Sequence, residues 1–209
     1  MAASPSVSLL TALLMGVYAA GVSAAPSTQP NLPEPRPVVV DPGKTALLVL
    51  DMSTRCNDPR QICSELAPVL ARFLPKARAA GVLTIYTVSL NARGTALGEV
   101  WGGFERKDDE LVLYPDGSDK CVGGEISTLL RERGIDTVIV TGSSSNQAVL
   151  YTASGAARNH GFKTIIPVDG MNAANPYEHE YTLHQLNNVS FASLFSFTTL
   201  DMLEFGERS

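Results

Sequence analysis

The sequence predicts an α/β fold of three layers, in which helices cover both faces of a doubly wound, mainly parallel sheet. A pattern of glycine, an apolar residue, any residue, threonine and two apolar residues occurs at 81–86, 134–139 and 161–166. Each glycine follows a segment of helical spacing, where it suits the left-handed residue that ends a helix. Each apolar run is short and β-branched, as in strands buried on both faces. Helices that alternate with such strands indicate a parallel sheet.

The other predicted elements follow from apolar spacing. They are, in chain order, a strand at 45–50, a helix at 62–77, helices around 126–130 and 149–157, and a last strand within 191–198. In the first helix, apolar residues recur at steps of three and four and form one face. Pro68 and Pro75 interrupt this helix, so we expect Pro68 near its first turn and Pro75 at a kink.

Length, composition and charge indicate a globular protein that does not bind nucleic acid. The chain has 209 residues, enough for one domain with a sizeable core, with 44% hydrophobic and 18% charged residues. The formal net charge is −5, and the lysines and arginines are scattered without a basic run. These features argue against a nucleic-acid partner.

The N-terminus carries the signs of a secretory signal. Residues 7–22 are an apolar run of sixteen residues, and Val22-Ser23-Ala24 then supplies small residues of the kind found at cleavage sites. We expect residues 1–24 to be a signal peptide that is cleaved after Ala24, which leaves a secreted or periplasmic protein without a membrane anchor. The run is short for a membrane span. Because it contains no lysine or arginine, an uncleaved anchor remains the alternative.

A proline-rich segment separates the signal from the domain. Residues 25–43 contain six prolines and few large apolar residues before Val38. Such a composition favours an extended, polyproline-like tether. The folded domain is therefore expected at 44–209.

The chain has three cysteines, at 56, 63 and 121. In an exported protein, Cys56 and Cys63 could close a short disulfide loop, and two free thiols near a turn are the alternative. Cys121 would then be a leftover thiol, whose role the sequence leaves open.

The predicted sheet places the candidate site. Ligands of open α/β sheets bind beyond the carboxyl ends of the strands. Asp51, residues 89–94 and residues 142–147 follow three predicted strands, and Asp169 follows a fourth. A partly desolvated carboxylate such as Asp51 suits a general acid or base, although turn and capping aspartates are also common at strand ends.

The segment 143–147 opens a predicted helix and contains no reactive side chain. Backbone N–H groups at a helix N-terminus bind anions and oxyanions, so Ser144, Ser145 and Asn146 are candidates for substrate binding. A serine-rich turn can also serve as an N-cap, and the two roles are compatible.

The connection at 95–123 is long and irregular and holds the aromatic residues Trp101, Phe104 and Tyr114. It is either a lid or pocket wall, in which Trp101 and Phe104 contact the substrate, or a covering loop whose aromatics fill a satellite core.

We expect neither a metal nor a cofactor. The histidines at 160, 179 and 184 lack metal-ligand spacing, and there is no Cys/His cluster. Neither a G-x-G-x-x-G nor a Walker-type phosphate loop is present.

The order of several motifs resembles the isochorismatase-like hydrolase superfamily, from about Lys44 to about Thr199. The matching motifs are Asp51-Met52 after its strand, the segment 131–142, Asn146, Thr152-Ala153 and the segment 167–170. The resemblance implies a Rossmann-like fold and, because members often assemble, a possible homo-oligomer.

Most members of that superfamily are cysteine hydrolases with an Asp–Lys–Cys triad. Asp51 matches the aspartate, whereas the nucleophilic cysteine position falls on Ala148. A methyl group cannot attack a carbonyl, so the thioester route is closed at that position. The family pattern puts Pro115 near the expected lysine, and Lys120 is a candidate only if its side chain enters from a neighbouring position. Whether Ala148 is natural or introduced is open.

The resemblance also implies a route without the cysteine, because isochorismatases hydrolyse a vinyl ether with the aspartate alone. We therefore predict an exported hydrolase that uses Asp51 on a vinyl ether or an amide-type C–N bond of a small molecule. The first alternative is an inactive pseudoenzyme that binds a small ligand in the same pocket. A second is that Cys121 replaces the nucleophile, which requires a nearby base.

Overall fold

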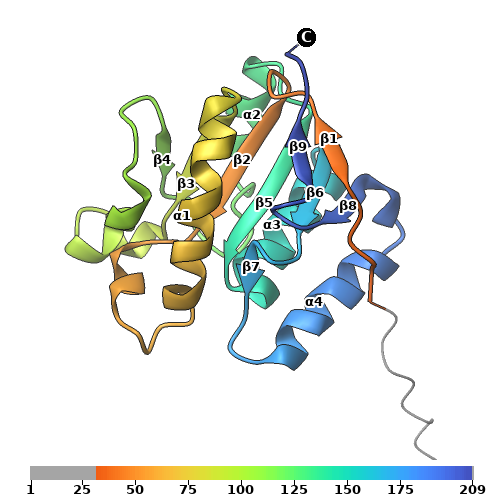
Figure 1. Ribbon diagram of the computed structural model, residues 1–209. Helices are drawn as coiled ribbons and strands as arrows, with labels where there is room; N and C mark the ends of the chain where they lie inside the picture. Colours follow the sequence, from red (N-terminus) through yellow and green to blue (C-terminus); the bar gives the residue numbers. More distant parts are fainter. Residues whose placement is uncertain (1–31, 209) are drawn as a thin grey trace, which may run out of the picture.

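The computed structural model describes residues 32–208 (Figure 1). The predicted signal peptide at 1–24 and the first part of the predicted tether lie outside the described residues. Within residues 32–208, no helix is long and apolar enough to cross a membrane.

A parallel sheet of seven strands forms the centre of the molecule. The strands run in the order β4-β3-β2-β5-β6-β8, and β7 pairs with β5 beyond the end of β6. All of these pairs are parallel, which confirms the predicted doubly wound α/β fold. The bounds are β2 (Thr45–Leu50), β3 (Leu83–Thr87), β4 (Leu111–Leu113), β5 (Thr137–Ser143), β6 (Lys163–Pro167), β7 (Met171–Asn172) and β8 (Phe195–Thr198).

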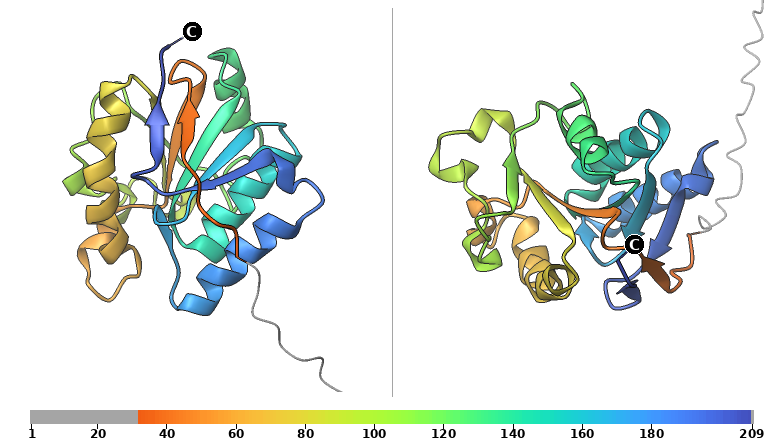
Figure 2. Two further views of the ribbon diagram at one scale, coloured as in Figure 1. Left: turned by 45° about the vertical axis from the view of Figure 1, so that its right-hand side comes forward. Right: turned by 90° about the horizontal axis from the view of Figure 1, so that it is seen from above.

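Helices cover both faces of this sheet, as Figure 2 shows. Helix α1 (Cys63–Ala79) covers one face, and α2 (Glu125–Glu132), α3 (Leu150–Arg158) and α4 (Pro176–Asn188) cover the other. Successive residues of a strand point to opposite faces. In β2, Leu47 and Val49 accordingly pack in the core with α1, while Leu48 and Leu50 pack in the core with α2 and α3.

Strands β4 and β7 and helix α4 are not among the elements predicted from the sequence. The start of α4 is well capped, because Asn175 accepts a hydrogen bond from the Glu178 backbone at 3.0 Å and Pro176 opens the first turn. Both Pro68 and Pro75 lie inside α1, and the described helix continues through both positions.

The boundary between tether and domain needs a correction. Val38–Val40 form strand β1, which pairs in parallel with β9 (Leu203–Phe205) near the C-terminus. The Arg36 backbone also donates a hydrogen bond to the Phe197 carbonyl at 2.9 Å. The end of the proline-rich segment is therefore part of the fold, because a distant strand supplies hydrogen-bond partners that local composition does not reveal.

The long connection between β3 and α2 contains short helical turns and strand β4. Its 3-10 turns are η2 (Leu90–Ala92), η3 (Ala96–Gly98) and η4 (Gly102–Phe104); η1 (Thr54–Asn57) lies before α1 and η6 (Ala192–Leu194) before β8. The long connection packs beside η1 through backbone contacts: Ser53 forms a β-bridge with Val100, and the Thr54 N–H donates to the Glu99 carbonyl at 2.9 Å.

Candidate functional site

A polar cleft of about 410 Å³ lies at the carboxyl ends of β2, β3 and β5, the edge at which the sequence predicts the site. Its lining is almost entirely polar, and Ala148 is its one apolar side chain. The lining residues are Asp51, Arg55, Ser89, Asn91, Asp116, Gly117, Ser118, Lys120, Ser143, Ser144, Gln147 and Ala148.

Asp51 ends the central strand β2 in an unusual backbone conformation. Its φ is 54°, in the left-handed region that aspartate tolerates better than most residues. Its N–H donates to the Thr87 carbonyl at 2.9 Å, and its Oδ1 accepts from the Thr87 hydroxyl at 3.4 Å. These bonds fix the carboxyl group at the edge of the sheet, where 18% of the side chain stays exposed.

Lys120 is the partner of Asp51. Its Nζ lies 2.8 Å from Asp51 Oδ2, and the lysine side chain is only 2% exposed. The same ammonium donates a hydrogen bond to the Gly117 carbonyl at 3.0 Å. A buried ammonium needs such partners, because isolated burial of a charge is very costly. The family pattern indicates a lysine near Pro115. The structure instead brings Lys120, five residues further along the chain, to Asp51.

The loop that carries Lys120 is held against α3. The Lys120 N–H donates to Thr152 Oγ1 at 3.0 Å, and this hydroxyl donates to the Ser118 carbonyl at 3.3 Å. The Asp119 carboxylate accepts from the Cys121 N–H at 2.8 Å and lies directly over Gly155, where a Cβ atom would collide with it. A small residue at 155 thus allows the loop to approach the helix and aim Lys120 into the cleft.

The turn between β5 and α3 forms the opposite wall. The Ser143–Ser144 peptide bond is cis, and a π-helical turn, η5 (Ser145–Val149), then leads into α3. Ala148 is buried but its surface lines the cleft together with Ser143 and Ser144. First-turn N–H groups of a helix have no partner within it. This turn can therefore present N–H donors to an oxyanion.

Of the predicted substrate-binding residues in this turn, only Ser144 lines the cleft. Ser145 is fully buried, and its hydroxyl lies 3.0 Å from Nδ1 of His179 on α4. Burial lowers the pKa of His179, despite the opposing charge of Glu180, so the neutral ring can accept the hydroxyl hydrogen. Ser145 thus anchors the turn to α4, and the side chains of Ser145 and Asn146 are not brought to the cleft.

The prediction that Trp101 and Phe104 contact the substrate is corrected. Neither residue lines the cleft. Phe104 is 1% exposed and stacks on Tyr86 with ring centroids 5.8 Å apart, and the Trp101 ring meets Phe104 edge-on at 5.1 Å. The Trp101 indole also donates to Asn57 Oδ1 at 2.8 Å. These aromatics fill a core on the α1 face, because a covering loop of this length must bury apolar surface of its own.

Cys121 is unsuited to replace the nucleophile. Its side chain is 1% exposed and packs in the core with α2 and α3. Burial, aided by the charge of Asp119, raises the pKa of the thiol to about 12. Since the thiolate is the reactive form, this cysteine is inert at neutral pH.

Cys56 and Cys63 form a disulfide, with an S–S distance of 2.11 Å. The bond joins η1 to the first residue of α1. Arg55 lies on η1 beside the cleft, and its guanidinium donates to the Asp51 carbonyl at 3.3 Å. The disulfide therefore fixes the segment that supplies the second cation of the cleft.

Several lining residues were not singled out from the sequence, among them Arg55, Asn91, Asp116 and Gln147. Asn91 and Gln147 lie in the segments 89–94 and 142–147 that were expected at this edge, whereas Arg55 and Asp116 lie on turns that only the folded chain brings there. The Ser118 hydroxyl donates to Gln147 Oε1 at 3.3 Å. In the described part of the chain, no group of three or more His, Cys, Asp or Glu side chains is arranged to hold a metal ion.

Comparisons with known proteins identify the family of this domain and agree with its fold. The model of the isochorismatase domain matches residues 45–196. An isochorismatase family protein from Desulfovibrio vulgaris is similar in structure, with a TM-score of 0.67 and 23% identity over 76% of this chain and 95% of that chain. A cysteine hydrolase from Pseudomonas syringae pv. phaseolicola has a TM-score of 0.66 and 20% identity over 84% of this chain and 95% of that chain.

The nicotinamidase from Staphylococcus aureus has a TM-score of 0.63 and 24% identity over 75% of this chain and 97% of that chain. No curated protein matches the sequence significantly. At these identities the solved structures show the shared fold, and the domain match covers most of the chain. The chain belongs to the isochorismatase family.

Proposed function

We propose that the protein is an exported hydrolase that cleaves a vinyl ether or an amide-type C–N bond of a small molecule without a cysteine nucleophile. The observation that carries this proposal is the 2.8 Å ion pair between Lys120 Nζ and Asp51 Oδ2 in a cleft that also contains Ala148. Such a pair supplies a positioned proton-transfer group and a fixed positive charge. The predicted signal at 1–24 supports the export.

On a carbonyl C–N substrate, Asp51 acts as a base. Its carboxylate takes a proton from water while the water oxygen bonds to the carbonyl carbon, and the C=O electron pair moves to the oxygen. The N–H groups at the start of η5 stabilise that oxyanion. When the pair returns, the C–N bond breaks and the leaving nitrogen takes the proton from Asp51.

On a vinyl ether, the proton moves first. Asp51 delivers it to the terminal carbon of the double bond, whose electron pair forms the new C–H bond. Water adds to the resulting oxocarbenium ion and gives its proton back to Asp51. The hemiketal then separates into a carbonyl compound and an alcohol. In both routes the Lys120 ammonium, 2.8 Å from Asp51 Oδ2, holds the Asp51 carboxyl group in position, and Ala148 forms no covalent intermediate.

The test is turnover of a panel of vinyl ethers, amides and small esters by the wild type and by Asp51→Asn. The substitution preserves shape but removes the proton-transfer group, so kcat is expected to fall by about 100-fold or more. Asp201→Asn, a change at an exposed site outside the cleft, is the matched control and should keep full activity. Equal rates for the wild type and Asp51→Asn would refute the mechanism.

A ligand-binding pseudoenzyme is the competing outcome of the same panel. In that case a compound would raise the melting temperature, depend on Asp51 and Lys120 for binding, and be recovered chemically unchanged. Ala148→Cys adds a second measurement. Gain of amidase activity in this variant would show that the turn and the ion pair still form the family's catalytic frame.

A further inference from the structure

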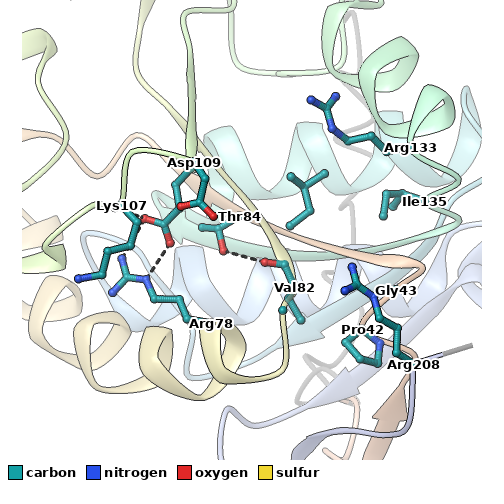
Figure 3. A pocket seen from close by; sticks show the side chains of 13 residues that line it. Pro42, Gly43, Arg78, Val82, Thr84, Lys107, Asp109, Arg133, Ile135 and Arg208 are labelled. Carbon is teal, nitrogen blue, oxygen red and sulfur yellow. Dashed lines mark hydrogen bonds and ion pairs between the residues drawn. The ribbon is translucent and has the colours of Figure 1, made fainter.

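A second cavity lies at the opposite edge of the same sheet and has no part in the proposed hydrolysis (Figure 3). Its volume is about 520 Å³, within the usual range of small-molecule sites. Its lining includes residues 42–43 and 81–84, together with Arg133 and Ile135, which lie at the amino ends of β2, β3 and β5. Since a six-residue strand is roughly 20 Å long, the cavity is well separated from the cleft.

A partly buried, electrically neutral network of paired charges forms one wall of the cavity. Arg78 holds Glu110 through bonds of 2.7 Å and 3.0 Å, and the Tyr86 hydroxyl donates to the same carboxylate at 3.2 Å. The Lys107 N–H adds a bond of 2.9 Å. Burial acts to raise the pKa of Glu110, but the hydrogen bonds from Arg78 and Lys107 outweigh it and lower the pKa. Both oxygens of the Glu110 carboxylate therefore already have hydrogen-bond donors.

The rim carries an excess of positive charge. Lys107 and Arg133 make no ion pair within residues 32–208, and Asp109 is the one carboxylate of the lining besides Glu110. In Figure 3, Lys107 and Asp109 lie on one side of the cavity, and Arg133 and Arg208 on the other. Arg133 and Arg208 therefore lie across the opening from Lys107 and from the single rim carboxylate.

The part of the cavity between these charges is apolar. Pro42, Val82 and Ile135 are buried residues that contribute to its lining. At Gly43 the missing side chain leaves room for Arg208, because a Cβ atom there would lie 2.8 Å from Arg208 Cγ. A guanidinium is thus held next to the apolar wall.

We propose that this cavity binds a small organic anion, a carboxylate or phosphate group carried on an apolar ring or chain. The guanidinium groups of Arg133 and Arg208 match the geometry of both oxyanions, and the ammonium of Lys107 adds a third charge. The apolar wall takes the body of the ligand. Because Arg78 and Glu110 neutralise each other, Asp109 is the one lining carboxylate that opposes the rim charges.

The experiment is isothermal titration of the full-length protein with benzoate, phenyl phosphate, inorganic phosphate and the uncharged benzyl alcohol. Benzoate or phenyl phosphate is expected to bind more tightly than inorganic phosphate and benzyl alcohol, and the stronger of the two identifies the preferred oxyanion. In the double variant Arg133→Gln/Arg208→Gln, the affinity is expected to fall about tenfold or more, because charged hydrogen bonds are lost. Arg72→Gln removes an exposed charge from α1 outside this cavity and should bind as the wild type does.

Three results would overturn the proposal. The first is the absence of heat for both aromatic anions up to millimolar concentrations. The second is equal affinity in the double variant. The third is loss of binding in Asp51→Asn, which would place the ligand in the cleft. Circular dichroism of the double variant checks its folding, and since both arginines are exposed, the fold is expected to be retained.

Discussion

The two ends of the central sheet hold charged groups in opposite ways. At the carboxyl ends, Lys120 is 2% exposed, and its ammonium group pairs with Asp51 and donates to the Gly117 carbonyl. At the amino ends, Arg78 and Glu110 form a largely buried ion pair with each other, while the side chains of Lys107, Arg133 and Arg208 are exposed to water. The same sheet therefore carries a fixed, largely desolvated ion pair at one end and solvent-exposed charges at the other.

The largest expected effect is a fall in kcat caused by the substitution Lys120→Met, which acts at the carboxyl ends of the sheet and not at the amino ends. This change keeps most of the side-chain volume but leaves Asp51 without its buried cation, so kcat on the substrate found by the panel should fall by about 100-fold or more. Lys44→Met, just before the amino end of β2, is the matched control and should leave kcat unchanged. If both variants turn over equally fast, the ion pair is structural and the contrast between the edges loses its functional meaning.

The second effect concerns the disulfide beside the cleft. Replacing Cys56 and Cys63 together by serine should lower the free energy of unfolding by about 2–4 kcal/mol, because the unfolded chain is no longer cross-linked. Urea unfolding measures the change. Addition of a reductant should destabilise the wild type to the same level and leave the double variant unaffected. A wild type insensitive to reductant would contradict the bond's role in stability.

The third effect compares two glycines. In Gly155→Ala the new Cβ meets the Asp119 carboxylate, which is part of the loop that positions Lys120, and overpacking of this kind costs about 1–3 kcal/mol. In Gly43→Ala the nearest atom is Cγ of Arg208, a flexible side chain that can move, so the cost should stay below about 0.5 kcal/mol. Chemical denaturation of both variants tests the pair. A larger loss for Gly43→Ala would show that the rim, rather than the cleft, is the tighter packed edge.

The smallest effect is a pH dependence at the anchor of the turn. Burial lowers the pKa of His179 below its ordinary value of 6.5, so the unfolded state binds a proton more readily than the folded state. This contribution to stability is present above pH 6.5 and is lost as the pH falls through the lowered pKa. His179→Gln, which can still accept a hydrogen bond from Ser145, should reduce the fall in urea midpoint between neutral and acidic pH. An identical fall in both proteins would assign the pH dependence to other groups.

Much of the fold was predictable because its signals are local. The repeated glycine and apolar runs predicted β3, β5 and β6, since a strand buried on both faces must be apolar along its whole length. Helix α4 escaped because its apolar face is weak, although the capping signal at Asn175 was readable. Strand β1 could not be predicted, because its partner β9 lies at the other end of the chain.

The candidate site divides in the same way. The sequence alone shows that a carboxylate, Asp51, follows a buried strand and that the turn before α3 has polar donors. The family resemblance implies that Ala148 stands where most members have a thiol. Only the tertiary structure decided that Lys120 reaches Asp51, that Ser145 bonds to His179, and that Phe104 belongs to the core. The physical reason is that strand ends and caps follow from neighbouring residues, whereas a side chain's partner across a loop depends on how that loop packs against α3.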